Sequence, residues 1–222
     1  MAKKSVLCCM GFLSAALLFP ARAWALVVLN EFLADPPAGI AGDANRDGVR
    51  SSSQDEFVEL LNIGEAGGDL SLWSLWDSIA LRHAFPPGTE LAPWGRLVIF
   101  GGGSPLGIPG FVTTASSGSL SLNNSGDEIV LKDSEGKVID RAAFSSEADQ
   151  DQSLARFPEG TGSFQPHRSV SSRGLLFSPG TDPQGESQRP AATPEPASGA
   201  LLGVGLVAVR LFKRRRIGFH AG

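Results

Sequence analysis

The chain has 222 residues, of which 42% are hydrophobic and 19% are charged, and its formal net charge is −4. All 23 acidic residues lie between residues 26 and 209, whereas 8 of the 19 basic residues lie outside that span, which leaves the span a net charge of −12. Such an acidic surface repels nucleic acid backbones and favours divalent cations or basic partners.

The N-terminus predicts a secretory signal peptide over residues 1–25. Lys3 and Lys4 precede an apolar run from Val6 to Phe19, and Ala23-Trp24-Ala25 offers the small residues that a signal peptidase recognises. The apolar run is shorter than the roughly 20 residues that span a membrane, so we expect cleavage after Ala25 rather than anchoring. Both cysteines, Cys8 and Cys9, lie inside this segment. The mature chain therefore has no disulfides and relies on core burial or a bound metal.

Four apolar segments in the first half of the chain are predicted as strands, because Gly or Pro interrupts the chain around them. They cover residues 26–33, 57–63, 70–76 and 79–85. The first ends at Asp35-Pro36-Pro37, since proline has no N–H to donate to a strand ladder.

The second half of the chain also contains short apolar segments that predict strands. Residues 97–100 form a compact apolar run that is typical of a strand buried on both faces, and residues 111–112 follow after a glycine-rich connection. Further segments cover residues 120–122, 129–131 and 138–144. The last two flank Asp133-Ser134-Glu135-Gly136, which predicts a hairpin because glycine supplies the positive φ of the turn.

Seven to nine short strands without useful helical periodicity predict an all-β, immunoglobulin-like antiparallel β-sandwich over residues 26–181. Four aromatic side chains are the expected core: Phe57, Trp73, Trp76 and Phe100. After Ala148 we expect loop that wraps the sandwich, and residues 182–193 have the composition of a linker.

The C-terminal segment, residues 194–216, has three parts in order. Pro194-Glu195-Pro196 precedes the apolar stretch 197–209, and a basic cluster that includes Arg214, Arg215 and Arg216 follows. This predicts a short membrane helix whose basic end stays in the cytoplasm.

These residues resemble the PEP-CTERM sorting signal of Gram-negative bacteria. The resemblance implies recognition by an exosortase, a membrane transpeptidase, and cleavage near Pro194 to Pro196. It also implies transient anchoring by the helix, then release or attachment at the cell surface, often beside exopolysaccharide.

The body resembles the lamin tail domain, an immunoglobulin-like sandwich. The residues that carry the resemblance are Leu29-Asn30-Glu31-Phe32, the run 56–62, the run 70–75, Gly126-Asp127-Glu128-Ile129-Val130-Leu131 and Val138-Ile139-Asp140. Leu72 departs from a common glycine of the family. The resemblance implies a binding or architectural module and no enzyme activity.

The loop from Asp43 to Val49 reads Asp-Ala-Asn-Arg-Asp-Gly-Val, which matches the opening of a calcium loop. Oxygen atoms at alternate positions converge on one cation, and Gly48 permits the sharp turn. The twelfth position, where a bidentate acid is expected, is Gln54, and Asp55 and Glu56 follow it. We therefore expect Ca²⁺ to be held by Asp43, Asn45, Asp47, Val49, Asp55 and Glu56. An ordinary polar loop is the alternative.

No catalytic constellation emerges from the sequence. The mature chain has no cysteine or tyrosine, and His83, His167 and His220 lie in no known catalytic motif. The sequence thus favours an exported, surface-sorted, non-catalytic module, stabilised by calcium and associated with the cell surface or an exopolysaccharide matrix.

Two alternatives remain open. The first is a calcium-dependent hydrolase of polysaccharide or nucleic acid in which Glu31 and Glu59 form a carboxylate pair beside the Asp43 loop. The second is a carbohydrate-binding module that uses Trp73, Trp76 or Trp94.

Overall fold

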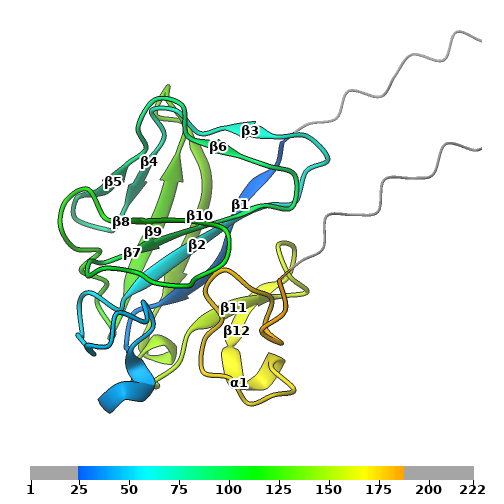
Figure 1. Cartoon of the computed structure of the whole chain (residues 1–222). Helices are drawn as coiled ribbons and strands as arrows, with labels where there is room; N and C mark the ends of the chain where they lie inside the picture. The colour runs from blue at the N-terminus through cyan, green and yellow to red at the C-terminus, as the bar shows by residue number, and fades with distance from the viewer. Residues whose placement is uncertain (1–24, 188–222) are drawn as a thin grey trace, which may run out of the picture.

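The computed structural model describes residues 25–187, which form an all-β, mostly antiparallel fold of several sheets (Figure 1). The largest sheet has six strands in the order β12-β11-β1-β2-β7-β8. Their bounds are β1 Val27–Leu33, β2 Phe57–Asn62, β7 Arg96–Phe100, β8 Phe111–Thr114, β11 Leu154–Phe157 and β12 Ser163–Pro166.

A second sheet has four strands in the order β10-β9-β4-β5, and a third pairs β3 with β6. Their bounds are β3 Gly68–Asp69, β4 Ser74–Trp76, β5 Leu81–Ala84, β6 Glu90–Leu91, β9 Asp127–Lys132 and β10 Val138–Phe144. Helical structure in the described residues is limited to short pieces: the 3₁₀ turns η1 Gly39–Gly42 and η2 Ser146–Ala148, and the helix α1 His167–Val170.

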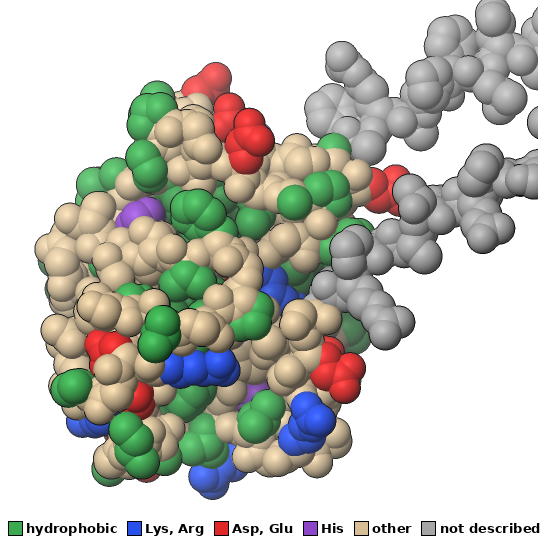
Figure 2. Space-filling view, viewed as in Figure 1, with side chains coloured by type: hydrophobic (Ala, Val, Ile, Leu, Met, Phe, Trp, Pro, Cys, Tyr) green, Lys and Arg blue, Asp and Glu red, His purple; other side chains and the backbone are tan. Residues whose placement is uncertain are grey.

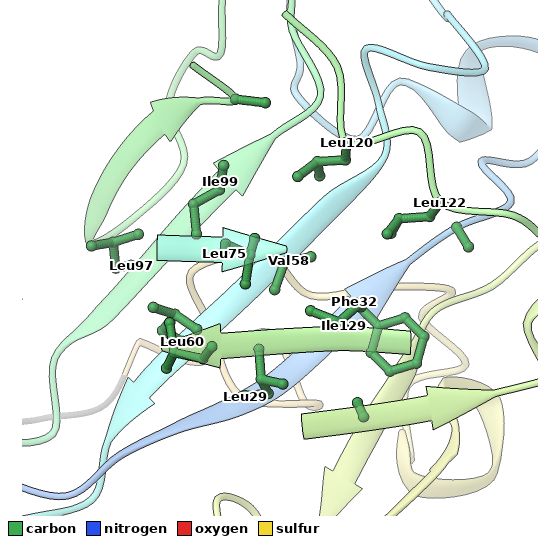
Figure 3. Close-up of a cluster of buried hydrophobic side chains, with 14 of the residues drawn as sticks. Leu29, Phe32, Val58, Leu60, Leu75, Leu97, Ile99, Leu120, Leu122 and Ile129 are labelled. Carbon is green, nitrogen blue, oxygen red and sulfur yellow. The ribbon is translucent and has the colours of Figure 1, made fainter. Parts of the chain in front are cut away.

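The main core joins the two larger sheets (Figure 3). Leu29, Val58 and Leu60 come from the six-stranded sheet, and Leu75 and Ile129 from the four-stranded sheet; all are at most 1% exposed. Because successive strand residues point to opposite faces, the alternate positions of β1, β2 and β7 supply this layer. The packing of two sheets around one core is consistent with an immunoglobulin-like sandwich.

The opposite face of the six-stranded sheet is buried as well. Leu33, Phe57 and Phe100 form a second cluster there, against which Phe177 and Ile108 pack. Every residue of β2 and β7 is therefore buried, as expected for the apolar run 97–100. Phe177 belongs to the segment from residue 153 to 181, here called the wrap. The first part of the wrap adds β11 and β12 to the edge of the six-stranded sheet, and its last part covers this face (Figure 1).

The strand predictions are largely confirmed, including the β9–β10 hairpin. In that hairpin Asp133 N–H donates to the Lys137 carbonyl, and Gly136 has φ +81°. Twelve strands in residues 25–187 exceed the seven to nine expected, because several are only two to four residues long. Residues 120–122 form no strand, although Leu120 and Leu122 do enter the core.

Two expectations need correction. β8 runs parallel to β7, because residues 101–110 carry the chain back to the start of β7 before it pairs. The region after Ala148 is also more than loop, since it contains β11, β12 and α1. β11 pairs with β1 through Glu31 and Ala155 and so extends the six-stranded sheet.

The core aromatic predictions are confirmed for Phe57 and Phe100, which are fully buried. Trp73 is partly buried against the main core. Trp76 is half-buried and carries the Lys132 ammonium 4.3 Å above its ring, because β4 turns that side chain away from the core.

Candidate functional site

The loop between β1 and β2 folds around its own acids. Asp47 N–H donates to the side-chain oxygens of both Asp43 (3.1 Å) and Asn45 (3.0 Å). Gly48 N–H donates to the second Asp43 oxygen at 2.9 Å, in a turn where Gly48 has φ +90°. Glycine adopts this left-handed conformation without steric cost, so the loop takes the sharp turn that its sequence predicts.

Asp55 closes the loop from its far end. Its carboxylate accepts the N–H of Asn45 (3.1 Å) and of Ser51 (2.6 Å). Burial raises the pKa of Asp55, and the charge of Asp43 contributes in the same direction. The structure thus gathers Asp43, Asn45, Asp47 and Asp55 into one connected group.

The glycine-rich segment after β7 also packs on this loop. Ser104 N–H donates to Asp47 at 3.1 Å, and the Asn45 amide donates to the Gly102 carbonyl. The Ser104 hydrogen bond is the main cause of the lowered pKa of Asp47. The triple glycine 101–103 is therefore more than a flexible connection, since it lets backbone approach the acids closely.

Of the two remaining expected ligands, Val49 stays beside Asp47 in the loop and Glu56 points away from it. Val49 was expected to offer its backbone carbonyl, and its N–H donates to Asp47 at 2.9 Å. The Glu56 carboxylate turns into the fold and accepts Leu122 N–H at 3.3 Å, where burial raises its pKa to about 8. Within residues 25–187, no three His, Cys, Asp or Glu side chains converge closely enough to hold a metal ion.

A second polar cluster lies under the wrap. Glu31 on β1 and Glu59 on β2 occupy directly paired positions, so their side chains share one face of the sheet. Glu59 accepts hydrogen bonds from Asn30 (2.9 Å), Arg96 (2.5 Å) and Gly180 N–H (2.7 Å). Burial raises the pKa of Glu59 to about 7, and the Arg96 charge opposes that rise.

Arg96 connects this cluster to the turn between β11 and β12. Its guanidinium bonds Glu159 at 2.5 Å on one side and Glu59 on the other. Asn30 adds a second link, because its side-chain oxygen accepts Gly160 N–H at 2.9 Å. The wrap is thus held by polar contacts to β1, β2 and β7 as well as by apolar packing.

Both carboxylate oxygens of Glu31 accept hydrogen bonds from the wrap. Ser153 donates its hydroxyl to Glu31 at 2.6 Å, and Ser178 donates both its N–H (2.8 Å) and its hydroxyl (2.6 Å). Glu31 is 1% exposed and Glu59 0%. The carboxylate pair considered from the sequence therefore exists in register, but it is enclosed and fully engaged with donors.

The remaining sequence candidates lie apart from both clusters. His83 on β5 is buried, and its Nδ1 accepts Ser116 N–H at 3.2 Å. Trp94 follows β6 and is 36% exposed. On the face shown in Figure 2, basic side chains lie apart from one another, and acidic ones gather near the tip that carries the β9–β10 hairpin.

Several predictions from the sequence concern residues outside the described range: the signal peptide 1–25 up to Trp24, His220, and the sorting residues Pro194, Glu195, Pro196, Arg214, Arg215 and Arg216. Within residues 25–187, no helix has the length and apolar character needed to cross a membrane.

The fold and its buried polar clusters define an all-β module built on a Leu-Asn-Glu-Phe strand. Comparison with protein families identifies that module: the Lamin Tail Domain family matches residues 20–146, and the chain belongs to this family. The PEP-CTERM protein-sorting motif matches residues 192–216. This motif is a signal for exosortase-type processing and marks the chain as exported and sorted to the cell surface. A comparison with curated proteins gives no match.

Proposed function

We propose that this protein is a non-catalytic binding or structural module of the cell surface, associated with an exopolysaccharide matrix and stabilised by Ca²⁺ in the 43–55 loop. Sorting to the surface follows from the C-terminal motif. The observation that carries the non-catalytic part is the enclosure of Glu31 and Glu59, whose oxygens already accept donors from the wrap.

The hydrolase alternative requires a carboxylate that can reach a substrate. Glu31 and Glu59 are shielded by Ser153, Ser178 and Gly180, which leaves no oxygen of the pair facing solvent. Arg96 further commits Glu59 to an ion pair. These contacts support a structural role for both acids.

The association with matrix is testable with the mature chain, residues 26–193, and the insoluble exopolysaccharide of the producing cells. We expect the protein to sediment with the polysaccharide without releasing reducing ends, in the presence of Ca²⁺ and of EGTA. Release of reducing ends or cleavage of nucleic acid that is lost in Glu59→Gln would favour the hydrolase. Quenching of tryptophan fluorescence by soluble glycans, lost in Trp94→Ala, would favour the carbohydrate-binding module.

The calcium part of the proposal rests on the loop itself. Asp43 and Asn45 both accept the N–H of Asp47, and the Asp47 carboxylate accepts the N–H of Val49. Asp55 joins the group from the other end of the loop, where it accepts the N–H of Asn45. Small rotations of these side chains would exchange their N–H partners for a cation, which prefers carboxylate and amide oxygens. Glu56 is left out of the proposed shell because its carboxylate lies at Leu122.

Thermal melting with and without Ca²⁺ tests this part by linkage. At a free concentration of about 100 times the dissociation constant, Ca²⁺ should stabilise the native protein by about 2.7 kcal/mol. Asp43→Asn with Asp47→Asn should abolish the gain, and Asp133→Asn, which alters an acid of the β9–β10 turn, should keep it. An equal gain in the loop variant and the wild type would overturn the calcium proposal.

A further inference from the structure

The four-stranded sheet has an outer face that is open to solvent. Leu75 on β4 and Ile129 on β9 point into the main core (Figure 3). Because successive strand residues point to opposite faces, Trp76 and Val130 lie on the outer face. On the same face Trp76 is half-buried and Arg141 of β10 is exposed. The six-stranded sheet differs, since the wrap covers its second face.

One row of side chains crosses three strands of this outer face. Trp76 pairs with Val130, and Val130 pairs with Arg141. Val130 is only 8% exposed, because a larger side chain covers it on each side. Small residues follow on the other strand, where Ser74 pairs with Ala84 of β5. The indole of Trp76 therefore lies on a flat surface that a ligand can approach.

Polar groups surround the indole ring. The Lys132 ammonium lies 4.3 Å from the ring centroid, and Nε1 of Trp76 donates to the Ser74 hydroxyl at 3.0 Å. Arg141 and Glu128 form an ion pair of 3.2 Å whose side chains are 60% and 35% exposed. Such an exposed pair is weak, and the lysine ammonium sits on a flexible stem. All three charged groups can therefore turn to hydrogen-bond a ligand beside the ring.

The charge of this face differs from that of the protein as a whole. Two cations, Lys132 and Arg141, stand beside the Glu128 carboxylate, so the face is nearly neutral. The span 26–209 carries a net charge of −12, which repels polyanions. Asp133, in the adjoining turn, accepts the N–H groups of Glu135 and Lys137. These charges favour an uncharged, polar ligand.

The apolar area is small for a protein partner. Specific protein interfaces bury about 1,200–2,000 Å² around an apolar centre. The apolar side chains of the row are Trp76 and the largely covered Val130. A single aromatic ring edged by hydrogen-bonding groups matches a sugar residue instead, because a sugar ring has an apolar C–H face and a rim of hydroxyls.

We propose that the outer face of the four-stranded sheet binds an uncharged polysaccharide chain. Trp76 stacks on one sugar ring, and Lys132, Arg141 and Glu128 hydrogen-bond to hydroxyls. β4 and β10 flank β9, so Trp76 and Arg141 lie about 10 Å apart and contact a chain of sugars rather than one. The inference rests on the proposed association with matrix polysaccharide and names the face that carries it.

Affinity electrophoresis tests the face directly. The mature chain, residues 26–193, is run in native gels that contain hydroxyethylcellulose, an uncharged polysaccharide, with EGTA to keep Ca²⁺ out of the 43–55 loop. The wild type should be retarded, and Trp76→Ala should weaken binding at least about tenfold, as for an aromatic anchor. Lys132→Gln and Arg141→Gln should each weaken it about three- to tenfold.

Two variants are matched controls. Trp94→Ala alters a tryptophan that is 36% exposed beyond β6, and Arg168→Gln alters an exposed cation of α1; both should keep the wild-type retardation. Lys132→Gln and Arg141→Gln change side chains outside the core, so they test the face even if Trp76→Ala is destabilised. No retardation of the wild type, equal retardation by the polyanion carboxymethylcellulose, or unchanged binding in the Lys132 and Arg141 variants would overturn the inference.

Sedimentation with the exopolysaccharide of the producing cells separates this inference from the proposed function. Equal sedimentation of wild type, Lys132→Gln and Trp76→Ala would overturn the role of this face and leave the association with matrix intact. Failure of the wild type to sediment would contradict the association itself, whereas the gels with hydroxyethylcellulose judge the face independently.

Discussion

Glu59 and Arg96 form a buried ion pair on the face of the six-stranded sheet that the wrap covers, with 2.5 Å between Oε1 and Nη1 and side chains that are 0% and 4% exposed. Arg96 also bonds Glu159, so the pair joins the sheet to the wrap. Removing one partner would leave an uncompensated charge in a region closed to water.

Arg96→Met should therefore destabilise the protein by about 3–5 kcal/mol, measured by urea unfolding at pH 7. Arg141→Met is the matched control, because Arg141 and Glu128 form an exposed pair on the four-stranded sheet at 3.2 Å. Its effect should stay within about 1 kcal/mol. Equal effects of the two substitutions would contradict a structural role for the buried pair.

Gly180 fixes the course of the wrap over Glu59. Its φ is +80°, and a Cβ atom there would lie 2.2 Å from the Pro109 carbonyl oxygen. Gly180→Ala should displace the wrap and cost about 2–4 kcal/mol in urea unfolding, because it combines backbone strain with a backbone clash.

Gly174 provides the control for this glycine. It has φ +69°, but a Cβ atom there meets nothing within 4 Å. Gly174→Ala should therefore cost only about 1 kcal/mol, the strain of a left-handed alanine. A Gly180 variant no less stable than the Gly174 variant would show that the contact with Pro109 is unimportant.

Glu56 makes stability depend on pH. Burial raises its pKa from 4.5 to about 8, so the native state binds a proton that the unfolded chain releases above pH 4.5. The resulting stability is fully present below pH 4.5 and is lost as pH rises through 8. Glu56→Gln should remove this contribution, which is on the order of a few kcal/mol, and leave the smaller loss that comes from Glu59, whose pKa burial raises to about 7.

Denaturant unfolding from pH 5 to pH 9 measures this dependence. The solutions contain EGTA, so that Ca²⁺ at the proposed site, which includes the neighbouring Asp55, does not contribute to stability. Glu65→Gln, at an exposed position, should leave the wild-type profile unchanged. An equal slope of stability against pH in Glu56→Gln and wild type would contradict the role of Glu56 and assign the slope to Glu59 alone.

The folded unit should extend past the family match at residue 146. Leu154 enters the main core, Phe164 packs against it, and the wrap supplies donors to Glu31 and Glu59. A fragment of residues 26–146 should therefore lack a cooperative thermal transition, and a fragment of residues 26–187 should melt cooperatively. Near-ultraviolet circular dichroism distinguishes the two, and native-like melting of the shorter fragment would contradict this expectation.

Local patterns were enough to predict much of the fold. Alternating or continuous apolar runs predicted β1, β2, β7, β9 and β10, because one or both faces of these strands are buried. The wrap was predicted as a loop, and its strands β11 and β12 were not predicted, because they are short and rich in polar residues. Their partners are distant in sequence: Ser153 meets Glu31, which lies 122 positions earlier.

The candidate sites were likewise predictable where their contacts are local in sequence and unpredictable where they are distant. The connected group of Asp43, Asn45 and Asp47 was predictable because its contacts are local. Glu31, Glu56 and Glu59 are buried by segments that lie much later in the sequence. Their burial could therefore not be predicted from the residues around them. A charged residue in the middle of an apolar strand was the available signal, since such a residue needs buried partners.

Gln184 sets the length of chain between the folded module and the sorting motif. Its side chain accepts from Ser172 and donates to the Val170 carbonyl, which holds the chain on the module almost to residue 187. The residues between 187 and Pro194 reach at most about 25 Å when fully extended. The tether to the sorting motif is therefore shorter than residues 182–193 suggest, so exosortase-type processing has to act within about 25 Å of the folded module.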